Sequence, residues 1–396
     1  MRFIIFIIFF LKVSFAYADQ LQVTYAGFSF SGNFIDKDKT GQFTNKLLSI
    51  KKDNGVDIVS DSLLSTIKKV NPKNFNISFE FADLKKGSKE SIVMAIALDN
   101  ESYSVEYEPI SKTFLNNLVN FYQILFYDFN SKKLIASIPF DTELQFFSKK
   151  KLNEQEIVNR LKTFYTSGSI SQNGEKKINI FSKLENILNN FYLKNKYKFR
   201  IGVTKVIFED KAKPFLPKQY EGNTEILNNI FAQSLSSRLS LHQSVALVPY
   251  SEGMAIGGTM KQRFINSDEI YDVKLPKPDF NINLYIRGFK KVAAKTSDVS
   301  TVYLFGSFVR IQVMQPDINK VYFDEKIKNA NQIKIPNSIK NIDEWRKFYI
   351  STLVLFDEFS ANIKKPDPKW INNSLTNKDS AKKAFQNLNI VLDKVR

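Results

Sequence analysis

The sequence predicts an α/β or α+β protein in which helices pack on mixed sheets, with long antiparallel hairpins and two domains of similar size. Three observations predict this class: a strand–helix–strand unit at 197–249, a strand meander at 280–327, and amphipathic helical patterns near the carboxyl end. Apolar residues at every second position indicate strands with one buried face, and apolar residues every 3.6 positions indicate helices.

The strand–helix–strand unit organises the chain. Alternating apolar residues predict a strand at 197–204, and capping side chains at 223–225 begin a helix that is expected to end near Ser240. A second short strand is expected at 245–248. Two strands joined by a helix of this size usually lie parallel, so we expect a parallel pair here.

The first residues match a secretory signal peptide. Arg2 supplies the positive charge, residues 3–11 are apolar, and Ala16-Tyr17-Ala18 has the small residues that precede cleavage. The apolar run is shorter than the roughly 20 residues that span a bilayer. We therefore expect a signal peptide at 1–18, cleavage near Ala18, and a periplasmic or secreted protein.

A small, polar stretch at 166–174 is the clearest break in the remaining chain. We predict an amino-terminal α+β domain at 19–166, a linker or surface loop at 167–178, and a carboxy-terminal α/β domain with terminal helices at 179–396.

Individual elements follow from the local patterns. In the amino-terminal domain we expect strands at 20–30, 76–81, 92–98 and 103–107, helices at 44–51, 62–70, 113–120 and 153–164, and a hairpin made by 121–129 and 134–147. In the carboxy-terminal domain we further expect helices at 180–192, 343–363 and 380–395, and strands at 280–286, 302–314 and 321–327.

The two halves share a local layout. Residues 126–135 and 314–322 each place an aspartate and an asparagine at the end of a strand, before the chain returns as a second strand. An internal duplication would produce this echo. Any two hairpins would also produce it, because aspartate and asparagine are common in turns, so both explanations stay open.

Composition limits the possible chemistry. The chain has no cysteine, which excludes disulfides, thiolate metal sites and a cysteine nucleophile, and it carries a formal charge of +17. Lysines that are scattered along the chain are typical of base composition at exposed positions. They also suit an anionic polymer or a membrane surface, whereas nucleic acid is not the expected partner.

Few side chains suit catalysis. His242 is the only histidine, so a zinc site is nearly excluded, and Ser251, Ser267 and Ser307 lack a nucleophile-elbow pattern. Paired carboxylates remain candidates for polysaccharide hydrolysis: Asp99, Glu101, Glu106, Glu108, Asp324, Glu325, Asp357 and Glu358. We assign no catalytic, cofactor-binding or metal-binding residue among them, and we expect no cofactor.

Two further motifs are incomplete. The glycine-containing segment 251–259 lacks the lysine and the spacing of a phosphate loop, so a flexible loop is expected there. Asp36-Lys37-Asp38 begins a calcium-loop pattern that does not continue.

The order strand, helix, strand, two-strand ribbon and helix over about 196–363 resembles the periplasmic α/β domain of the curli secretion lipoprotein group. The amino-terminal domain of the translocation protein TolB and the lipoprotein activators of penicillin-binding proteins are similar. The resemblance is one of layout without a diagnostic motif, and the lipidation cysteine of the lipoproteins is missing here. It implies an envelope module that binds or assembles without catalysis.

The sequence therefore favours an exported, non-enzymatic binding or assembly protein of the cell envelope, whose partner is another envelope protein. Two alternatives are a carboxylate-dependent hydrolase of envelope polysaccharide and a basic binder of an anionic polymer or membrane surface.

Overall fold

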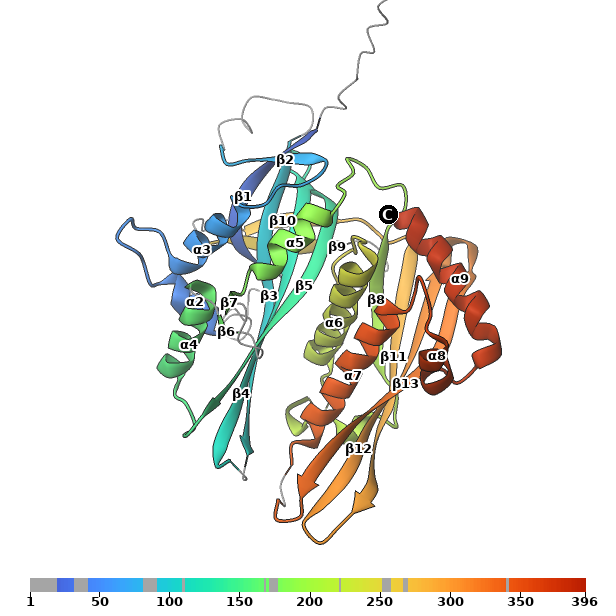
Figure 1. Ribbon diagram of the computed structural model, residues 1–396. Helices are drawn as coiled ribbons and strands as arrows, with labels where there is room; N and C mark the ends of the chain where they lie inside the picture. Colours follow the sequence, from blue (N-terminus) through green and yellow to red (C-terminus); the bar gives the residue numbers. More distant parts are fainter. Residues whose placement is uncertain are drawn as a thin grey trace, which may run out of the picture.

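A computed structural model describes most of the chain (Figure 1). The described residues are 20–31, 42–80, 91–108, 111–166, 169–170, 177–220, 222–250, 258–265, 270–339 and 342–396. The predicted signal peptide, the incomplete calcium-loop pattern at 36–38, the glycine-containing residues 251–257 and part of the predicted linker lie outside the described residues.

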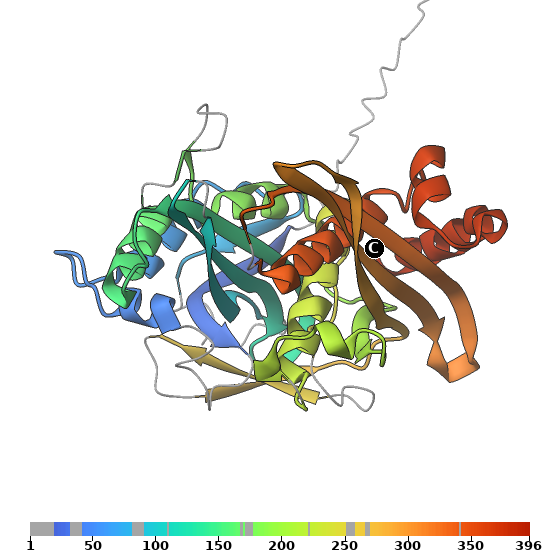
Figure 2. The ribbon, with the colours of Figure 1, turned by 90° about the horizontal axis from the view of Figure 1, so that it is seen from below.

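The predicted fold class is confirmed, because two mixed sheets with packed helices form two halves that lie side by side (Figure 1, Figure 2). Residues 20–190 form, in order, β1 (Leu21–Ser31), α2 (Gln42–Leu48), α3 (Ile58–Ile67), β2 (Phe75–Ser78), β3 (Ile92–Glu108), β4 (Thr113–Asp128), β5 (Lys133–Ser148), α4 (Glu154–Thr166), β6 (Ser169–Ile170), β7 (Lys177–Ile178) and α5 (Ser182–Asn190). Residues 201–395 form β8 (Ile201–Phe208), η3 (Lys213–Phe215), η4 (Lys218–Tyr220), α6 (Glu225–Gln243), β9 (Gly258–Phe264), β10 (Ile270–Leu275), β11 (Phe280–Thr296), β12 (Ser300–Gln315), η6 (Pro316–Ile318), β13 (Lys320–Pro336), α7 (Glu344–Ala361), α8 (Pro368–Ser374) and α9 (Lys378–Val395).

The first sheet closes into a ring. Its strand order in the described residues is β2-β1-β3-β4-β5-β10-β9, and β9 also pairs with β1 through Ser31 and Gln262. Between β5 and β10 the register contains one pair, Lys133 with Lys274. We call this contact the seam. The interior of the ring is apolar, and its buried residues are Val93, Ala95, Ala97, Leu125, Tyr127, Leu134, Val248, Met260, Val273 and Leu275.

The second sheet has the order β13-β12-β11-β8, with β8 parallel to β11 and the other pairs antiparallel. Along β11 the residues Phe280, Ile282 and Leu284 are buried and their neighbours are half-buried, as expected for a strand with one covered face. Residues of α6, α7, α8 and α9 join the same hydrophobic core. The alternation predicted from sequence is therefore confirmed in this meander.

The two halves repeat one topology. In the first, β1 lies parallel to β3, which continues into the antiparallel β3–β4–β5 meander and then α4. In the second, β8 lies parallel to β11, which continues into the β11–β12–β13 meander and then α7. One or two helices separate the first strand from the meander in each half, and β9 and β10 are inserted only in the second.

Two irregularities of the meanders also coincide, whereas a further bulge at Ala294 of β11 has no counterpart in β3. A bulge falls at the eighth residue of β3 (Asp99) and at the eighth of β11 (Arg287). Another falls at the third residue of β5 and of β13, and each of these strands follows a residue with positive φ, Lys132 or Asn319. Bulges are retained within families. Shared bulge positions therefore support an internal duplication over a chance echo.

The helix predicted at 113–120 is wrong, because these residues begin strand β4. Val119 and Phe121 pack in the second core, whereas Leu118 and Tyr122 pack in the first. Both faces of the strand are covered, so adjacent residues are apolar and the alternation that indicates a strand is hidden. The strands predicted at 92–98 and 103–107 are likewise one strand, β3, which the bulge interrupts.

The short strand predicted at 245–248 is also wrong. No strand is assigned there, and the parallel partner of β8 is β11. The segment instead bridges the two sheets, since Leu247 N–H donates to the Ser137 carbonyl at 2.9 Å and Val248 N–H donates to the Ile201 carbonyl at 2.8 Å. β8 itself begins at Ile201, later than predicted, and Tyr197 packs in the first core.

The predicted division into domains stays a prediction, and the chain crosses between the sheets more than once. Strands β9 and β10 come after α6 in sequence but complete the first sheet (Figure 1). Helix α5 packs in the first core although it follows the predicted linker. Within the described residues, no helix combines the length and the apolar content that a bilayer crossing requires.

Substitution of Gly202 tests the bridging segment. A Cβ atom at this position would lie 3.0 Å from the Val248 carbonyl oxygen and 3.2 Å from Val248 Cβ. We expect Gly202→Ala to lower the free energy of unfolding by about 1–3 kcal/mol, because the segment must shift. Gly306→Ala is the matched control, since its Cβ would approach no atom closer than 3.5 Å. Urea denaturation that shows equal costs for both variants would contradict the close approach.

Candidate functional site

Helix α6 lies between the two halves and forms the base of the candidate site. It contacts β5 of the first sheet and β8 of the second, as well as α7 (Figure 1). Its apolar residues join the second core, while Ser237 and Arg238 face Asp141 of β5. The two halves therefore meet through a polar contact beside the apolar core.

Asp141 is the centre of that contact. Ser237 Oγ donates to Asp141 Oδ1 at 2.6 Å, and Arg238 Nη1 lies 3.3 Å from the same oxygen. Lys183 Nζ donates to the Asp141 carbonyl oxygen at 2.7 Å. Burial alone would raise the pKa of Asp141, but Arg238, Lys183 and Ser237 together outweigh it and hold the pKa below its usual value. The ionised Asp141 therefore joins the two halves through a salt bridge and a hydrogen bond.

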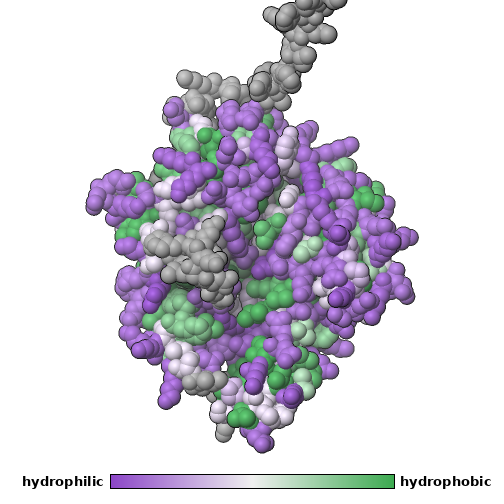
Figure 3. All heavy atoms as spheres, in the orientation of Figure 1, coloured by the Kyte–Doolittle hydropathy of each residue, from purple (hydrophilic) through white to green (hydrophobic). Residues whose placement is uncertain are grey.

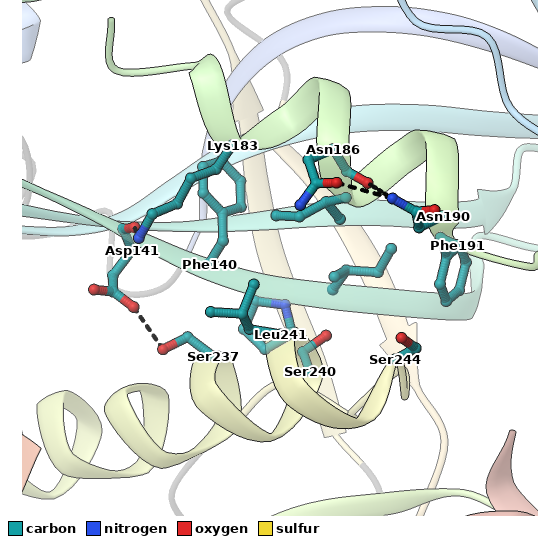
Figure 4. Close-up of a pocket in the computed structure, with 13 residues that line it drawn as sticks. Phe140, Asp141, Lys183, Asn186, Asn190, Phe191, Ser237, Ser240, Leu241 and Ser244 are labelled. Carbon is teal, nitrogen blue, oxygen red and sulfur yellow. Dashed lines mark hydrogen bonds between the residues drawn. The ribbon is translucent and has the colours of Figure 1, made fainter. Parts of the chain in front are cut away.

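A small pocket opens on one side of this contact, between α5 and α6 over β5 (Figure 4). Its volume is about 230 Å³. Asn186 and Asn190 of α5 lie along one side, and Ser237, Ser240 and Ser244 lie opposite (Figure 4). Asn190 Nδ2 donates to Asn186 Oδ1 at 2.9 Å, so these two side chains of the pocket lining already bind each other.

A larger pocket, which we call the cleft, opens on the other side of the contact, with a volume of about 400 Å³. Its strand wall is polar and carries Ser102, Ser104, Asn117, Glu143 and Gln145. Its helix wall is largely apolar and carries Leu227, Ile230, Trp345, Ile350, Leu353 and Val354. Apolar surface is visible in the hollow between the two halves (Figure 3).

A second group of salt bridges joins the two halves, between β3 of the first and α7 of the second. Lys347 Nζ donates to Glu106 Oε2 at 2.8 Å, and Arg346 Nη1 lies 3.6 Å from the same oxygen. Arg346 lines the cleft and is 5% exposed, yet its Nε and Nη1 have no hydrogen-bond partner among the described residues. Asn117 Oδ1, in the opposite wall, also lacks one. Buried polar atoms are normally paired, so Arg346 and Asn117 leave a donor and an acceptor unsatisfied in opposite walls of the cleft.

The carboxylates considered from sequence all lie in the described residues, and most have a donor of their own. Glu101 accepts from the backbone N–H of Phe43 at 2.6 Å, at the start of α2, and burial raises its pKa in spite of its hydrogen bonds. Asp99 accepts from Ser31 Oγ at 3.0 Å, and burial raises its pKa to about 6. The remaining contacts are Arg310 with Asp324, Ser380 with Glu325, Trp370 with Glu358, His242 with Asp357 and Lys347 with Glu106. Glu108 lies half-buried at the end of β3.

His242 and Ser307 are placed in structural roles. His242 Nε2 lies 2.8 Å from Asp357 Oδ1, so the pair joins α6 to α7 at the edge of the cleft. Ser307 is buried and donates to the Phe348 carbonyl at 3.0 Å. Ser251 and Ser267 lie outside the described residues. In the part of the chain that the structure describes, no three metal-ligating side chains are grouped.

Sequence reasoning missed Asp141 and the polar residues Arg238, Arg346 and Asn117 that line the cleft. Each is a single polar residue within an otherwise ordinary strand or helix pattern. Their convergence depends on pairs as distant as Lys347 and Glu106, which are 241 positions apart. No local signal in the sequence reports such a contact.

Comparisons with known proteins give no family. No family model matches the chain, and no curated protein matches it. Among solved structures, the hypothetical protein CT253 from Chlamydia trachomatis is similar with 17% identity and a TM-score of 0.26, over 42% of this chain and 96% of that one. A neuraminyllactose-binding hemagglutinin homologue from Helicobacter pylori is similar with 12% identity and a TM-score of 0.23, over 44% of this chain and 87% of that one. With TM-scores this low, neither likeness bears on the function of this chain.

A double-mutant cycle tests the tie at Asp141. We expect Asp141→Ala to lower the free energy of unfolding by about 3 kcal/mol, because it leaves Arg238 largely buried without its carboxylate. Adding Arg238→Ala to that variant should cost little more, since the uncompensated charge is then removed. Urea denaturation of the four proteins measures the coupling. Strictly additive costs would show that the two side chains act independently.

The raised pKa of Asp99 predicts a pH dependence. Asp99 has a higher pKa in the folded protein than in the unfolded chain, so ionising it costs free energy of folding. This cost grows as pH rises from about 4 to about 6. Asp99→Asn should therefore raise the free energy of unfolding by up to about 3 kcal/mol at pH 7. It should change it little at pH 4. Asp272→Asn, at an exposed position, is the control; a pH-independent effect of Asp99→Asn would refute the assignment.

Proposed function

We propose that this chain is an exported, non-enzymatic binding or assembly protein of the cell envelope, periplasmic or secreted after cleavage near Ala18. In this proposal the cleft holds a polypeptide segment of another envelope protein. The observation that carries it is an apolar helix wall beside two buried residues with unfilled hydrogen-bonding atoms, Arg346 with its Nε and Nη1 and Asn117 with its Oδ1.

The chemistry of the cleft suits a polypeptide segment. A backbone carbonyl or a carboxylate would accept from Arg346, and a backbone N–H would donate to Asn117 Oδ1. Apolar side chains of the segment would cover Leu353 and Val354, which are half-buried in the absence of a partner. Interfaces commonly combine a buried apolar centre with a few well-placed polar groups.

One further observation supports a role without catalysis. Most of the carboxylates that were candidates for hydrolysis are engaged by donors that hold elements together, as Glu101 is at the start of α2.

The test compares variants of the two walls with a matched surface control. Leu353→Asp places a carboxylate on the helix wall, and Ser104→Trp fills the cleft from the strand wall. Ile390→Asp makes the same chemical change as Leu353→Asp on α9, at a residue that is 50% exposed. Proteins captured from envelope extract by the wild-type chain are purified and titrated against each variant.

We expect the purified partner to bind the wild type and Ile390→Asp equally, and to bind both cleft variants at least about tenfold more weakly. Circular dichroism establishes that the variants are folded. Unchanged affinity in both cleft variants would remove the cleft from the proposal. Turnover of a cell-wall polysaccharide by the pure protein would remove the claim that it is not an enzyme.

A further inference from the structure

A basic pocket lies at the seam, away from the cleft. Its volume is about 360 Å³, and it forms where β5 and β10 meet the segment that leads into β8. Four cationic side chains line it: Lys133, Lys196, Arg200 and Lys274. Apolar residues complete much of the lining: Ile92, Leu134, Ile135, Leu275 and Pro276.

The charges of this pocket are not balanced. Among the described residues Lys133, Lys196 and Lys274 are exposed and none of them forms a salt bridge. Asp128 is the one acid in the lining, and its Oδ1 already accepts from Ser131 N–H at 2.7 Å. An excess of positive charge in a concave site attracts anions.

The excess of positive charge weakens the contact between β5 and β10. Lys133 and Lys274 are direct register partners, so two lysines lie opposite each other at the one pair that joins the parallel strands β5 and β10. Like charges directly opposite each other weaken strand pairing. An anion between them would turn this repulsion into two attractions.

Arg200 adds specificity to the attraction. It is half-buried, its backbone N–H donates to Asp279 Oδ2 at 2.8 Å, and its Nη1 is 3.5 Å from the Tyr197 carbonyl oxygen. These contacts hold Arg200 in place immediately before the start of β8. A planar guanidinium beside several ammonium groups is the combination that recognises phosphate.

We propose that this pocket binds the phosphate group of a ligand whose apolar body covers the half-buried Ile135 and Pro276, and that the bound phosphate strengthens the seam between β5 and β10. The site is separate from the cleft, so it extends the proposed function without depending on it. The phosphate can come from a soluble compound or from a lipid headgroup.

Inorganic pyrophosphate and vesicles are the two probes. The full chain is titrated with pyrophosphate by calorimetry and by thermal unfolding, and it is sedimented with vesicles of phosphatidylglycerol or of phosphatidylcholine. The test variant is Lys133→Ala with Lys274→Ala. Its control is Lys382→Ala with Lys383→Ala, which removes the same charge from exposed positions of α9.

We expect pyrophosphate to raise the Tm of the wild type in a concentration-dependent way. Affinity should fall by about tenfold or more in Lys133→Ala with Lys274→Ala, and should stay within about twofold in the control. Binding to phosphatidylglycerol vesicles that is lost with the same variant would assign the phosphate to a lipid headgroup. Binding to pyrophosphate alone would assign it to a soluble compound.

Lys133→Glu separates the pocket from general charge effects. The carboxylate would pair with Lys274 across the seam, so this variant should have a higher Tm than the wild type without ligand and no further rise with pyrophosphate. Failure of the wild type to bind either probe would overturn the proposal. Equal loss of binding in the α9 control, or full binding by Lys133→Glu, would do the same.

Discussion

Helix α6 is buried on two sides, and the arrangement of the two halves follows from how each side is satisfied. Towards the second sheet it presents Phe231, Leu235 and Leu239, which are almost completely buried. Towards β5 it presents Ser237 and Arg238, which bind the single carboxylate of Asp141. The first contact is hydrophobic and tolerant of small shifts, whereas the second is directional, so it fixes how one half sits against the other. The two pockets beside Asp141 are the spaces that this contact leaves open.

The repeated topology explains why the two halves can differ so much in chemistry. Register and bulges are kept, but equivalent positions carry different residues: Glu101 and Phe289 each lie two residues after the bulge in β3 and β11. In the first half the carboxylate holds the start of α2. In the second half the aromatic ring of Phe289 packs against Trp345 and Phe348 of α7. A framework set by backbone pairing thus allows one half to gain buried polar networks while the other gains an aromatic core.

The sequence predicted the fold class and those elements in which one face alone is buried. Strand β11 and helix α7 belong to this group, because Ile282 and Leu284 alternate with polar residues and Asp343 caps the helix. Strand β4 was mistaken for a helix in part because both its faces are covered. The joining of β9 and β10 to the first sheet was also missed, since strand order within a sheet leaves no periodic signal. The cleft was missed for the same reason: its residues come from six separate elements, and each is ordinary where it stands.

The position of β9 and β10 in the chain delays folding of the first sheet during synthesis. The ring of the first sheet includes strands that follow α6, and β8 can find its partner β11 only after both have been made. Neither half is therefore complete when synthesis has passed residue 200, and contacts this distant in sequence are slow to form. A nascent chain of this design stays open until most of it has emerged. Such delay agrees with the export that we propose, because a chain that folded before entering a translocation pore would stall there.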